Sequence, residues 1–585
     1  MPRSSVVRAP LVALLTVVLA SIGLLSAGSA VAAAVPYAPA YHAGIDPYSS
    51  YEPEDTCSPT AKPGLVVWRD LLVRTYGSRW SNITRACSAS ISGHEEGRSL
   101  DWGSLASNAT QKAQADALLG WLLATDVHGN KHAMARRLGI QYIMFNNKMW
   151  RAYNPGAGWL PQMSGGKDCA TLGSGSVTTC HRDHIHFSFS WAGALKKTSY
   201  FTGSVPCPTP AAQPAFTAAM PINMTAVPVT PARVFSTLSG AGACRLQPKG
   251  WLDVKVTGVG GVPSTGVGAV ALNLTAVRAT SATYLSAYPT GTAFPGNSSV
   301  NVAAGGTAAG MVIVPVGSNG RVSIRSSYSP VDVNVDVVGY FTTATTGSTY
   351  SVAAKQKVMD TRDTSVMAAK ERRKILVAGQ LGVPADATGV LVNVTADSTG
   401  TGGNVGVSRA YGTVIGTSTV YFAKDQSVAN RALVALAPDG TIEVYASSQS
   451  HVRIDLVGWF GTGGENLRYN PVLPGRILDT RNGNGGVAPL TGGVPAELTV
   501  EGRRGIPADA HAVVGTLTVI RPTVSTNTTI WPTRSGQPAT ADFALPGGAV
   551  REGLVSPVLS NDGKVTLSVA SGAADATLDV LGYFR

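Results

Sequence analysis

Two short segments in the first third of the chain carry side chains that could hold a metal ion. The segment SGHEEGRSLDW places His94 seven positions before Asp101, and the segment CHRDHIHFSFSW contains Asp183, His184 and His186. Zinc accepts imidazole nitrogens and carboxylate oxygens, and a catalytic zinc site keeps three protein ligands and one open position. His94, Asp101 and His186 would supply such a set. A water molecule in the open position would ionise near neutral pH, so the chemistry expected is metal-assisted hydrolysis.

The second segment has the pattern of a β-strand that turns its histidines to one side. Apolar and polar residues alternate from Ile185 onward, and successive side chains of a strand point to opposite faces. His184 and His186 therefore share the polar face. The other face is apolar and would pack into the core: Ile185, Phe187, Phe189 and Trp191. A base must take the proton of the water, and the alternation favours His184 over Asp183 unless the strand begins only at His184.

The residues between the two segments predict the frame of an α+β domain at 35–202. QKAQADALLGWLLATD has helical spacing, with one apolar stripe: Ala115, Leu118, Leu119 and Leu122. NKHAMARRLG predicts a second helix that stops at Gly139. IQYIMFN is expected to be a buried strand, and helices beside an antiparallel sheet give an α+β domain.

Other polar residues of this region have less certain partners. Arg85 could pair bidentately with a substrate carboxylate or with a structural acid. Glu95 and Glu96 adjoin a ligand and could support it, with one of the two expected to face solvent. Three other histidines of the region are expected to be surface residues: His128, His132 and His181.

The first residues predict a secretory signal peptide at 1–34. Arg3 and Arg8 precede an apolar run from about Leu11 to Leu25, and small residues follow it. The run is too short to span a bilayer, and we expect no membrane span after cleavage. The mature protein is therefore expected outside the cell or at the cell wall.

Six cysteines fit an exported chain, in which an even count favours disulfides. Spacing alone cannot choose among the many pairings that six cysteines allow. We predict that neighbours pair: Cys57–Cys87, Cys169–Cys180 and Cys207–Cys244.

The formal net charge of +12 favours an anionic partner. The basic residues are scattered and no recognised nucleic-acid-binding motif is present, so nucleic acid is not the expected partner. For an exported protein, wall teichoic acid is one such polymer, so a polymer of the cell wall is the expected partner.

The remainder of the chain predicts three similar all-β domains. A Pro-rich linker at 203–221 is followed by Val, Thr, Gly and Ser with short alternating runs. Motifs recur about every 120 residues, which is the size of a domain: a strand after GVP or GIP, and the closing motifs DVVGYF, DLVGWF and DVLGYF. We predict sandwich-like domains at 222–342, 350–461 and 469–585.

The Asp of each closing motif is expected to be scaffold at the end of a strand, with the aromatic pair packing the sandwich. Binding of an ion or ligand is the alternative. These residues are Asp336, Asp455 and Asp579.

The motifs His-x6-Asp and His-x-His, in this order, resemble the lysostaphin, D-alanyl-D-alanine peptidase and hedgehog superfamily of zinc enzymes. The resemblance implies that His94, Asp101 and His186 bind Zn²⁺ and that His184 takes part in catalysis. The carboxypeptidase branch has a Glu three residues before the ligand His, where this chain has the shorter Asp183.

A closer resemblance covers about residues 55–195. RACSASISGHEEGRSLDW and RRLGIQYIMFNNKMW are similar to a carboxypeptidase-like domain of exported actinobacterial proteins. The three repeats also resemble a module found in exported proteins of that group.

Together these features predict a secreted zinc peptidase that cuts stem peptides or cross-bridges of peptidoglycan, as a carboxypeptidase or an endopeptidase. The β-domains would contact the wall or its carbohydrate. One alternative is a non-catalytic wall- or carbohydrate-binding protein with a zinc-stabilised pseudo-peptidase domain. Another is a lytic enzyme directed at the walls of competitors.

Overall fold

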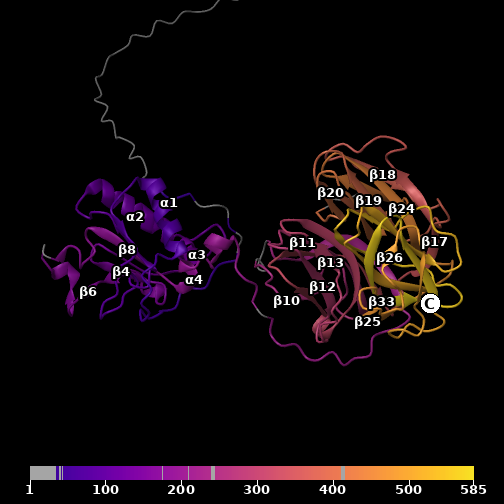
Figure 1. Ribbon diagram of the computed structural model, residues 1–585, viewed down its shortest axis with the longest axis horizontal. Helices are drawn as coiled ribbons and strands as arrows, with labels where there is room; N and C mark the ends of the chain where they lie inside the picture. Colours follow the sequence, from indigo (N-terminus) through magenta and orange to yellow (C-terminus); the bar gives the residue numbers. More distant parts are fainter. Residues whose placement is uncertain are drawn as a thin grey trace, which may run out of the picture.

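The computed structural model describes residues 34–37, 41, 44–173, 176–208, 210–238, 244–409 and 416–585. Residues 1–33 of the predicted signal peptide lie outside these ranges. An α+β domain comes first and a large β-rich unit follows it, joined by an extended linker (Figure 1). Within the described ranges, every helix is too short or too polar to span a membrane.

The N-terminal domain is built on a six-stranded antiparallel sheet with the order β1-β2-β8-β3-β4-β5. The strands of this domain are β1 (Ser81–Asn82), β2 (Ser99–Gly103), β3 (Ile140–Phe145), β4 (Lys148–Arg151), β5 (Leu160–Pro161), β6 (Met163–Ser164), β7 (Lys167–Asp168) and β8 (His184–Phe189). Its helices are α1 (Pro63–Tyr76), α2 (Ala109–Leu123), α3 (Ala133–Leu138), α4 (Trp191–Ala194) and α5 (Ser199–Thr202), with short 3-10 turns at Pro155–Ala157 and Cys169–Thr171. The predicted α+β class is confirmed.

Local sequence accounts for the two helices that were predicted. α2 begins after Asn108, whose side chain accepts a hydrogen bond from the Gln111 amide at 3.0 Å and so satisfies a free donor of the first turn. It buries the predicted stripe of Ala115, Leu118, Leu119 and Leu122. α3 ends at Gly139, which has φ 75°, a conformation that favours glycine.

One helix and one strand end depart from the predictions. α1 was not predicted, although it buries Leu65, Trp68 and Leu72 against the sheet, with the Trp68 ring 5.4 Å from that of Phe187. β8 ends at Phe189, so Trp191 does not continue its apolar face and instead begins α4. The cause is Ser190, whose side chain caps α4 by accepting a hydrogen bond from the Gly193 amide.

Three β-sandwiches make up the rest of the molecule. The first contains β9 (Thr225–Ser236), β10 (Trp251–Lys255), β11 (Val267–Val277), β12 (Thr283–Pro289), β13 (Val300–Val302), β14 (Thr307–Pro315), β15 (Arg321–Ser326) and β16 (Asp332–Thr342). The second contains β17 (Thr349–Asp360), β18 (Arg372–Leu376), β19 (Gly389–Ser398), β20 (Gly403–Arg409), β21 (Val420–Phe422), β22 (Ser427–Ala435), β23 (Thr441–Ala446) and β24 (Ser450–Gly461). The third contains β25 (Tyr469–Asp479), β26 (Leu490–Thr491), β27 (Ala496–Thr499), β28 (Ala512–Ile520), β29 (Thr526–Pro532), β30 (Phe543–Leu545), β31 (Val550–Val555), β32 (Lys564–Val569) and β33 (Ala573–Phe584).

All three sandwiches share one strand order. In the first, β14-β11-β16-β9 faces β10-β15-β12-β13, so the sixth, third, eighth and first strands form one sheet and the second, seventh, fourth and fifth form the other. The second and third sandwiches repeat this order, with β26 as an addition in the third. This is the topology of an eight-stranded jelly roll, and the prediction of repeated sandwiches is confirmed.

The carboxylate of each closing motif is buried and held by arginine. Asp336 pairs with Arg233, Asp455 with Arg453, and Asp579 with Arg476. In the first and third sandwiches the arginine lies on the neighbouring first strand. The second sandwich has Lys357 at that register position. There Arg453, two residues before Asp455 on β24, donates the hydrogen bonds to the Asp455 carboxylate. These pairings support the scaffold interpretation of the three Asp residues.

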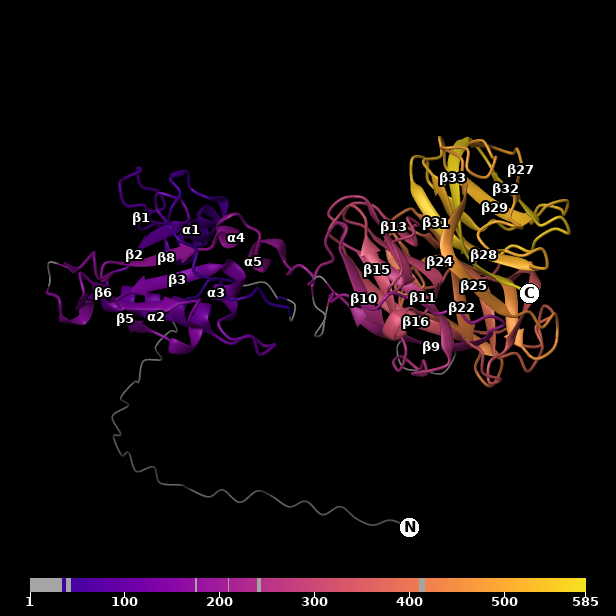
Figure 2. The ribbon, with the colours of Figure 1, turned by 90° about the horizontal axis from the view of Figure 1, so that it is seen from below.

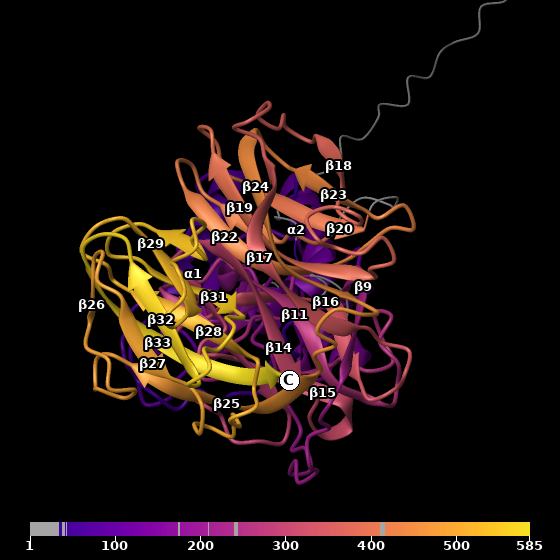
Figure 3. The same ribbon diagram turned by 90° about the vertical axis from the view of Figure 1, so that its right-hand side faces the viewer.

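The three sandwiches meet around a shared aromatic cluster. The last Phe of each closing motif (Phe341, Phe460 and Phe584) lies with Tyr350 and Tyr469, with ring centroids 4.3 to 5.4 Å apart. Each pair of sandwiches is in contact, and one hydrophobic core draws residues from all three. Figure 3 shows the three sandwiches grouped in this way. The closing Phe residues were expected to pack their own sandwiches, so this common core is a finding of the structure.

All three predicted disulfides are confirmed: Cys57–Cys87, Cys169–Cys180 and Cys207–Cys244. The first two brace loops of the N-terminal domain. The third ties the start of the linker to the first sandwich. Disulfides persist in oxidising compartments, so their number indicates an extracellular protein.

Candidate metal centre

Asp101 lies at the centre of a buried group of imidazoles. β2 pairs with β8 so that Asp101 is directly opposite His186. His186 Nδ1 lies 2.7 Å from Asp101 Oδ1, and His94 Nε2 lies 3.1 Å from Asp101 Oδ2. One potential ligand atom from each of the three residues lies within 4.8 Å of the other two, and all three residues are buried. The structure therefore brings together the three residues that the sequence predicts as metal ligands.

The orientation of His94 favours a cation in this group. Its Nδ1 lies 3.1 Å from the carbonyl oxygen of Ile83. A carbonyl can only accept, so Nδ1 carries the proton and the Nε2 lone pair of the neutral ring points at the Asp101 carboxylate. Two acceptors then face each other at 3.1 Å unless a proton or a metal ion lies with them. The donor set therefore fits a metal ion.

The turn before β2 places His94. Gly97 ends this turn with φ 69°, and a Cβ there would come within 2.1 Å of the Thr60 carbonyl oxygen. The Gly97 amide donates to the His94 carbonyl at 3.0 Å, and the Arg85 amide donates to the same oxygen at 3.2 Å. Backbone contacts thus fix the ligand before any metal binds.

The electrostatics of the group favour the protonation states that bind metal. Burial raises the pKa of Asp101, but the interactions with the His186 and His94 rings outweigh burial and bring that pKa well below its ordinary value. Burial lowers the pKa of His186, and the Asp101 carboxylate offsets only part of this effect. An ionised carboxylate and a neutral imidazole are the forms that ligate metals.

His184 lies beside the three ligands in an orientation suited to a base. Its Nε2 is 3.5 Å from Asp101 Oδ1, and its Nδ1 is 2.7 Å from Asp183 Oδ1. The Asp183 carboxylate also accepts a hydrogen bond from the Thr178 hydroxyl at 2.6 Å. Because a carboxylate holds the Nδ1 proton, the Nε2 lone pair is left facing the metal group. β8 begins at His184, so Asp183 is outside the strand and contacts the imidazole from its far side.

His181 belongs to this site, and the prediction that it is a surface residue was wrong. Its ring lies 4.8 Å from that of His184 and 5.6 Å from that of His186, and its Nδ1 lies 3.0 Å from Gln162 Oε1. Burial, with the charges of His186 and His184, lowers the pKa of His181 to about 3. It is therefore a neutral imidazole that adds no charge to the site. Its position three residues before His184 was the only signal in the sequence.

The other two histidines have different surroundings. His128 is exposed, as predicted. His132 is half-buried, with its Nδ1 3.0 Å from the Tyr48 hydroxyl and its ring 5.4 Å from that of Trp150. The surface prediction therefore holds for the first and was wrong for the second, which packs against aromatic rings.

Two aromatic residues that were not predicted complete the surroundings. Tyr142 of β3 stacks on the His186 ring at 5.6 Å and donates its hydroxyl hydrogen to Glu54 Oε1 at 3.1 Å. Trp80 approaches the His184 ring edge-on at 5.9 Å and leaves 61% of its own surface exposed. β3 lies beside β8, so a strand alternation that includes Tyr142 was the available signal. Trp80 lies in a loop and had none.

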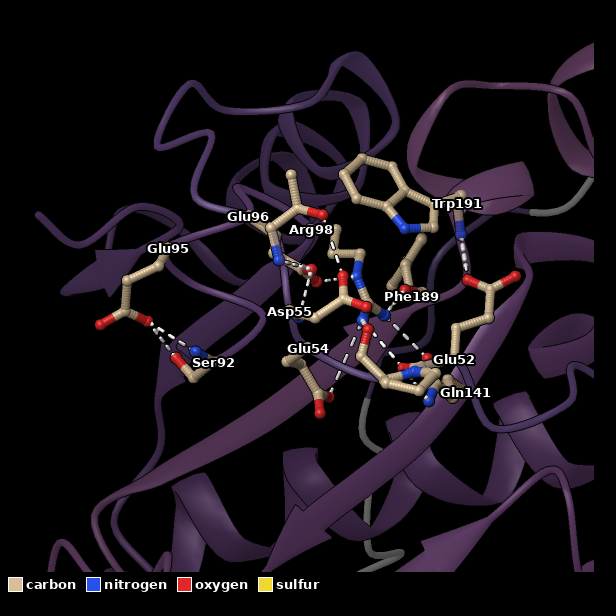
Figure 4. A network of polar contacts seen from close by, with 12 residues as sticks. Glu52, Glu54, Asp55, Ser92, Glu95, Glu96, Arg98, Gln141, Phe189 and Trp191 are labelled. Carbon is tan, nitrogen blue, oxygen red and sulfur yellow. Dashed lines mark hydrogen bonds and ion pairs between the residues drawn. The ribbon is translucent and has the colours of Figure 1, made fainter. Parts of the chain in front are cut away.

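Glu95 and Glu96 are both buried, so the prediction that one faces solvent was wrong. Glu96 forms an ion pair with the fully buried Arg98 and accepts hydrogen bonds from the Asp55 and Thr56 amides at 3.1 Å (Figure 4). The Arg98 guanidinium continues to other groups: Gln141 Oε1 and the Phe189 carbonyl at 2.8 Å, and the Glu52 carbonyl at 3.0 Å. This network ties the N-terminal segment to the sheet.

Glu95 is held locally instead. It accepts from the Ser92 amide at 3.0 Å and from the Ser92 hydroxyl. Burial raises the pKa of Glu95, but the Ser92 hydrogen bonds and the Arg85 charge bring it below its ordinary value. Arg85 itself is exposed, and its charge acts on this structural acid.

Comparison with known proteins covers part of this domain. A family model described as VldE, C-terminal domain, matches residues 57–172. That stretch contains His94 and Asp101 and ends before β8. No curated protein sequence matches the chain.

Two solved structures align with the chain at low similarity. One is described as "The Triple Jelly Roll Fold and Turret Assembly in an Archaeal Virus"; it is 8% identical, with 65% of this chain and 98% of that chain covered and a TM-score of 0.14. The other is described as "Life in the extremes: atomic structure of Sulfolobus Turreted Icosahedral Virus"; it is 9% identical over the same shares, with a TM-score of 0.12.

Proposed function

We propose that the protein is a secreted, zinc-dependent peptidase that acts on the peptide part of peptidoglycan. The observation that carries the proposal is the buried group of His94, Asp101 and His186 with His184 beside it, its Nε2 3.5 Å from Asp101. Two nitrogens and one oxygen suit Zn²⁺, and the set leaves a coordination position for a reactant.

The roles of the side chains follow from their contacts. A bound zinc ion supplies Lewis acidity, which activates water and polarises a peptide carbonyl. His184 takes the proton of the attacking water at Nε2 and returns it to the leaving amine. Asp183 holds the Nδ1 proton of His184 and stabilises the imidazolium formed during the reaction. Tyr142 packs the ligand His186, and Trp80 offers an exposed aromatic surface to substrate beside His184.

The choice of peptidoglycan rests on the compartment and on the resemblance of the two motifs to wall peptidases. Three disulfides indicate an extracellular protein. A net charge of +12 favours contact with the anionic polymers of a cell wall. We therefore place the protein at the wall, with stem peptides or cross-bridges as substrates.

The test is zinc content and release of new peptide termini from purified muropeptides, with the mature full chain and its His186→Ala variant. We expect one zinc ion per chain and peptide release for the wild type, and neither for the variant. Equal zinc in both proteins would show that the ligand set is wrong. Zinc without peptide release from any muropeptide would overturn the peptidase and leave a metal site.

The surroundings of Asp183 favour a second candidate, a wall-binding protein whose zinc site only stabilises the fold. The Asp183 carboxylate already accepts hydrogen bonds from Thr178 at 2.6 Å and from His184 at 2.7 Å. Its side chain is also shorter than the Glu of the carboxypeptidase branch. This candidate predicts zinc in the wild type, no turnover, and wall binding by the full chain.

A further inference from the structure

A hollow of about 410 Å³ lies on the outer sheet of the first sandwich, away from the histidines. Its floor is aromatic, formed by Trp251 of β10, Tyr288 of β12 and Phe294 of the following loop. Trp251 is 37% exposed, so part of its ring is open to solvent. Pockets that hold small ligands are of this size and combine apolar walls with a few polar groups.

Polar side chains surround these rings. Arg325, directly opposite Trp251 in the strand pairing, places its guanidinium over the Phe294 ring at 4.1 Å. The Asp253 carboxylate accepts a hydrogen bond from Ser323 at 2.6 Å, which fixes it on the same face. The exposed Lys249 lies at the edge. The hollow thus offers donors and an acceptor beside flat rings.

The interdomain linker forms one wall of the hollow and is pinned there. Gln213 lines the hollow, and its side-chain oxygen accepts a hydrogen bond from Asn319 at 3.0 Å. The Ser318 hydroxyl donates to the Pro214 carbonyl at 2.8 Å, and the Phe216 amide donates to the Gly291 carbonyl at 3.0 Å. The wall is therefore part of the folded structure and is formed before any ligand arrives.

Neither of the other two sandwiches has a Trp at the position of Trp251 with an Arg opposite it. Arg325 lies five residues after the glycine that leads into β15, and the same step leads to Tyr445 in β23 and Ser568 in β32. Opposite Tyr445 is Arg372, where the first sandwich has Trp251. The second sandwich exchanges the two side chains and keeps a cation–π contact, with the Arg372 guanidinium 5.8 Å from the Tyr445 ring. The first copy is therefore set apart by its tryptophan, which lies beside a hollow.

We propose that this hollow binds a sugar ring of the wall glycan. A pyranose ring has one face of C–H groups, which suits Trp251, and a rim of hydroxyl and acetamido groups, which suits Asp253 and Arg325. Opposite charges on the rim suit a neutral sugar better than a polyanion or a strongly charged peptide. β10 lies on the side of the β unit that is nearer the N-terminal domain in both views (Figures 1 and 2). Binding there would hold the glycan on the side of the β unit that is nearer the N-terminal domain.

The proposal shares with the proposed function only the wall as target and nothing of its metal chemistry. The probes are soluble chitohexaose, a chain of N-acetylglucosamine, followed by tryptophan fluorescence, and purified sacculi in a sedimentation assay. We expect the full chain to bind both. Trp251→Ala should weaken binding about tenfold or more, as truncating an exposed aromatic anchor does, and Trp251→Phe should recover part of it.

Tyr445→Ala is the matched control, because it removes the ring of the corresponding strand pair in the second sandwich, where Tyr445 lies opposite Arg372. It should bind like the wild type, and all variants should melt at the wild-type temperature. Equal binding by Trp251→Ala, or no binding of either probe by the wild type, would overturn the proposal. Trp251→Ala should keep its zinc and its release of peptides from soluble muropeptides, whereas His186→Ala should keep glycan binding, so the two proposals fail separately.

Discussion

The aspartate of the candidate metal site in the N-terminal domain and the closing-motif aspartates of the β unit have different partners. In the N-terminal domain, Asp101 faces two imidazoles, at 2.7 and 3.1 Å. In the β unit, each closing-motif carboxylate faces arginine, as in the bidentate pair of Asp579 with Arg476, with both distances 3.0 Å. The side chain and its burial are alike, and only the partner differs.

The partner determines what a buried carboxylate can do. Arginine is always charged in proteins, so it neutralises Asp336, Asp455 and Asp579 permanently and makes them part of the scaffold. Imidazole can give up its proton, and a metal ion can then take the position of that proton. Asp101 is thus paired with groups whose cation can be exchanged.

The largest expected effect is on turnover at the imidazole side of this comparison. His184→Ala removes the base, so peptide release should fall by roughly a thousandfold, while zinc content stays at the wild-type value. Steady-state release of peptide termini and metal analysis of the same samples measure both. Asp183→Asn should lose less, about tenfold, because the imidazole remains. Loss of zinc in His184→Ala would make it a ligand and contradict the assignment.

An effect on stability is expected at the arginine side. Asp579→Ala leaves Arg476 half-buried with only Asp479, at 3.2 Å, to pair with. We expect the free energy of unfolding of the β unit to fall by about 3 kcal/mol, without change in zinc content. Denaturant unfolding measures it. A chelator should act in the opposite way, destabilising the N-terminal domain and leaving the β unit as it was. If chelator also lowered the melting temperature of the β unit, the two parts would not depend on separate partners, which would contradict this comparison.

The smallest effect concerns a carboxylate with neither kind of partner. Glu552 of β31 accepts a hydrogen bond from Asn301 of the first sandwich at 2.6 Å, and burial raises its pKa to about 7 despite that bond and the nearby Arg551. The unfolded value is about 4.3. The stability it contributes is complete below that value and is lost as the pH rises through 7.

Glu552→Gln should therefore flatten the dependence of unfolding free energy on pH between about 4 and 8. The wild type should lose roughly 1–3 kcal/mol more than the variant over that range. Thermal melts across the range, with Asp562→Asn at the exposed end of the third sandwich as a control, measure it. Parallel curves for wild type and Glu552→Gln would show that this group does not titrate in the range.

The sequence carried enough information for the fold class, the repeats and the three residues that meet at the candidate metal site. Alternation along β8 and the helical stripe of α2 are local patterns, and a motif repeated three times marks each copy. Contacts between segments that are distant along the chain are not marked by any local pattern in the sequence. The Ile83 carbonyl that orients His94 and the return of His181 to the site depend on loops. The Tyr142 ring reaches His186 through the pairing of β3 with β8, which is known only from the folded structure.

The meeting of Phe341, Phe460 and Phe584 fixes how many copies of the repeat a working chain can have. In solenoid arrays each copy touches only its neighbours, so recombination can add or remove one at small cost. Here every copy contacts both others and contributes a ring to one centre. A gene that lost one copy would leave Tyr350 or Tyr469 facing water, and a fourth would find no vacant place at that centre. Duplication could build this array, but once it had closed at three, selection would preserve the number.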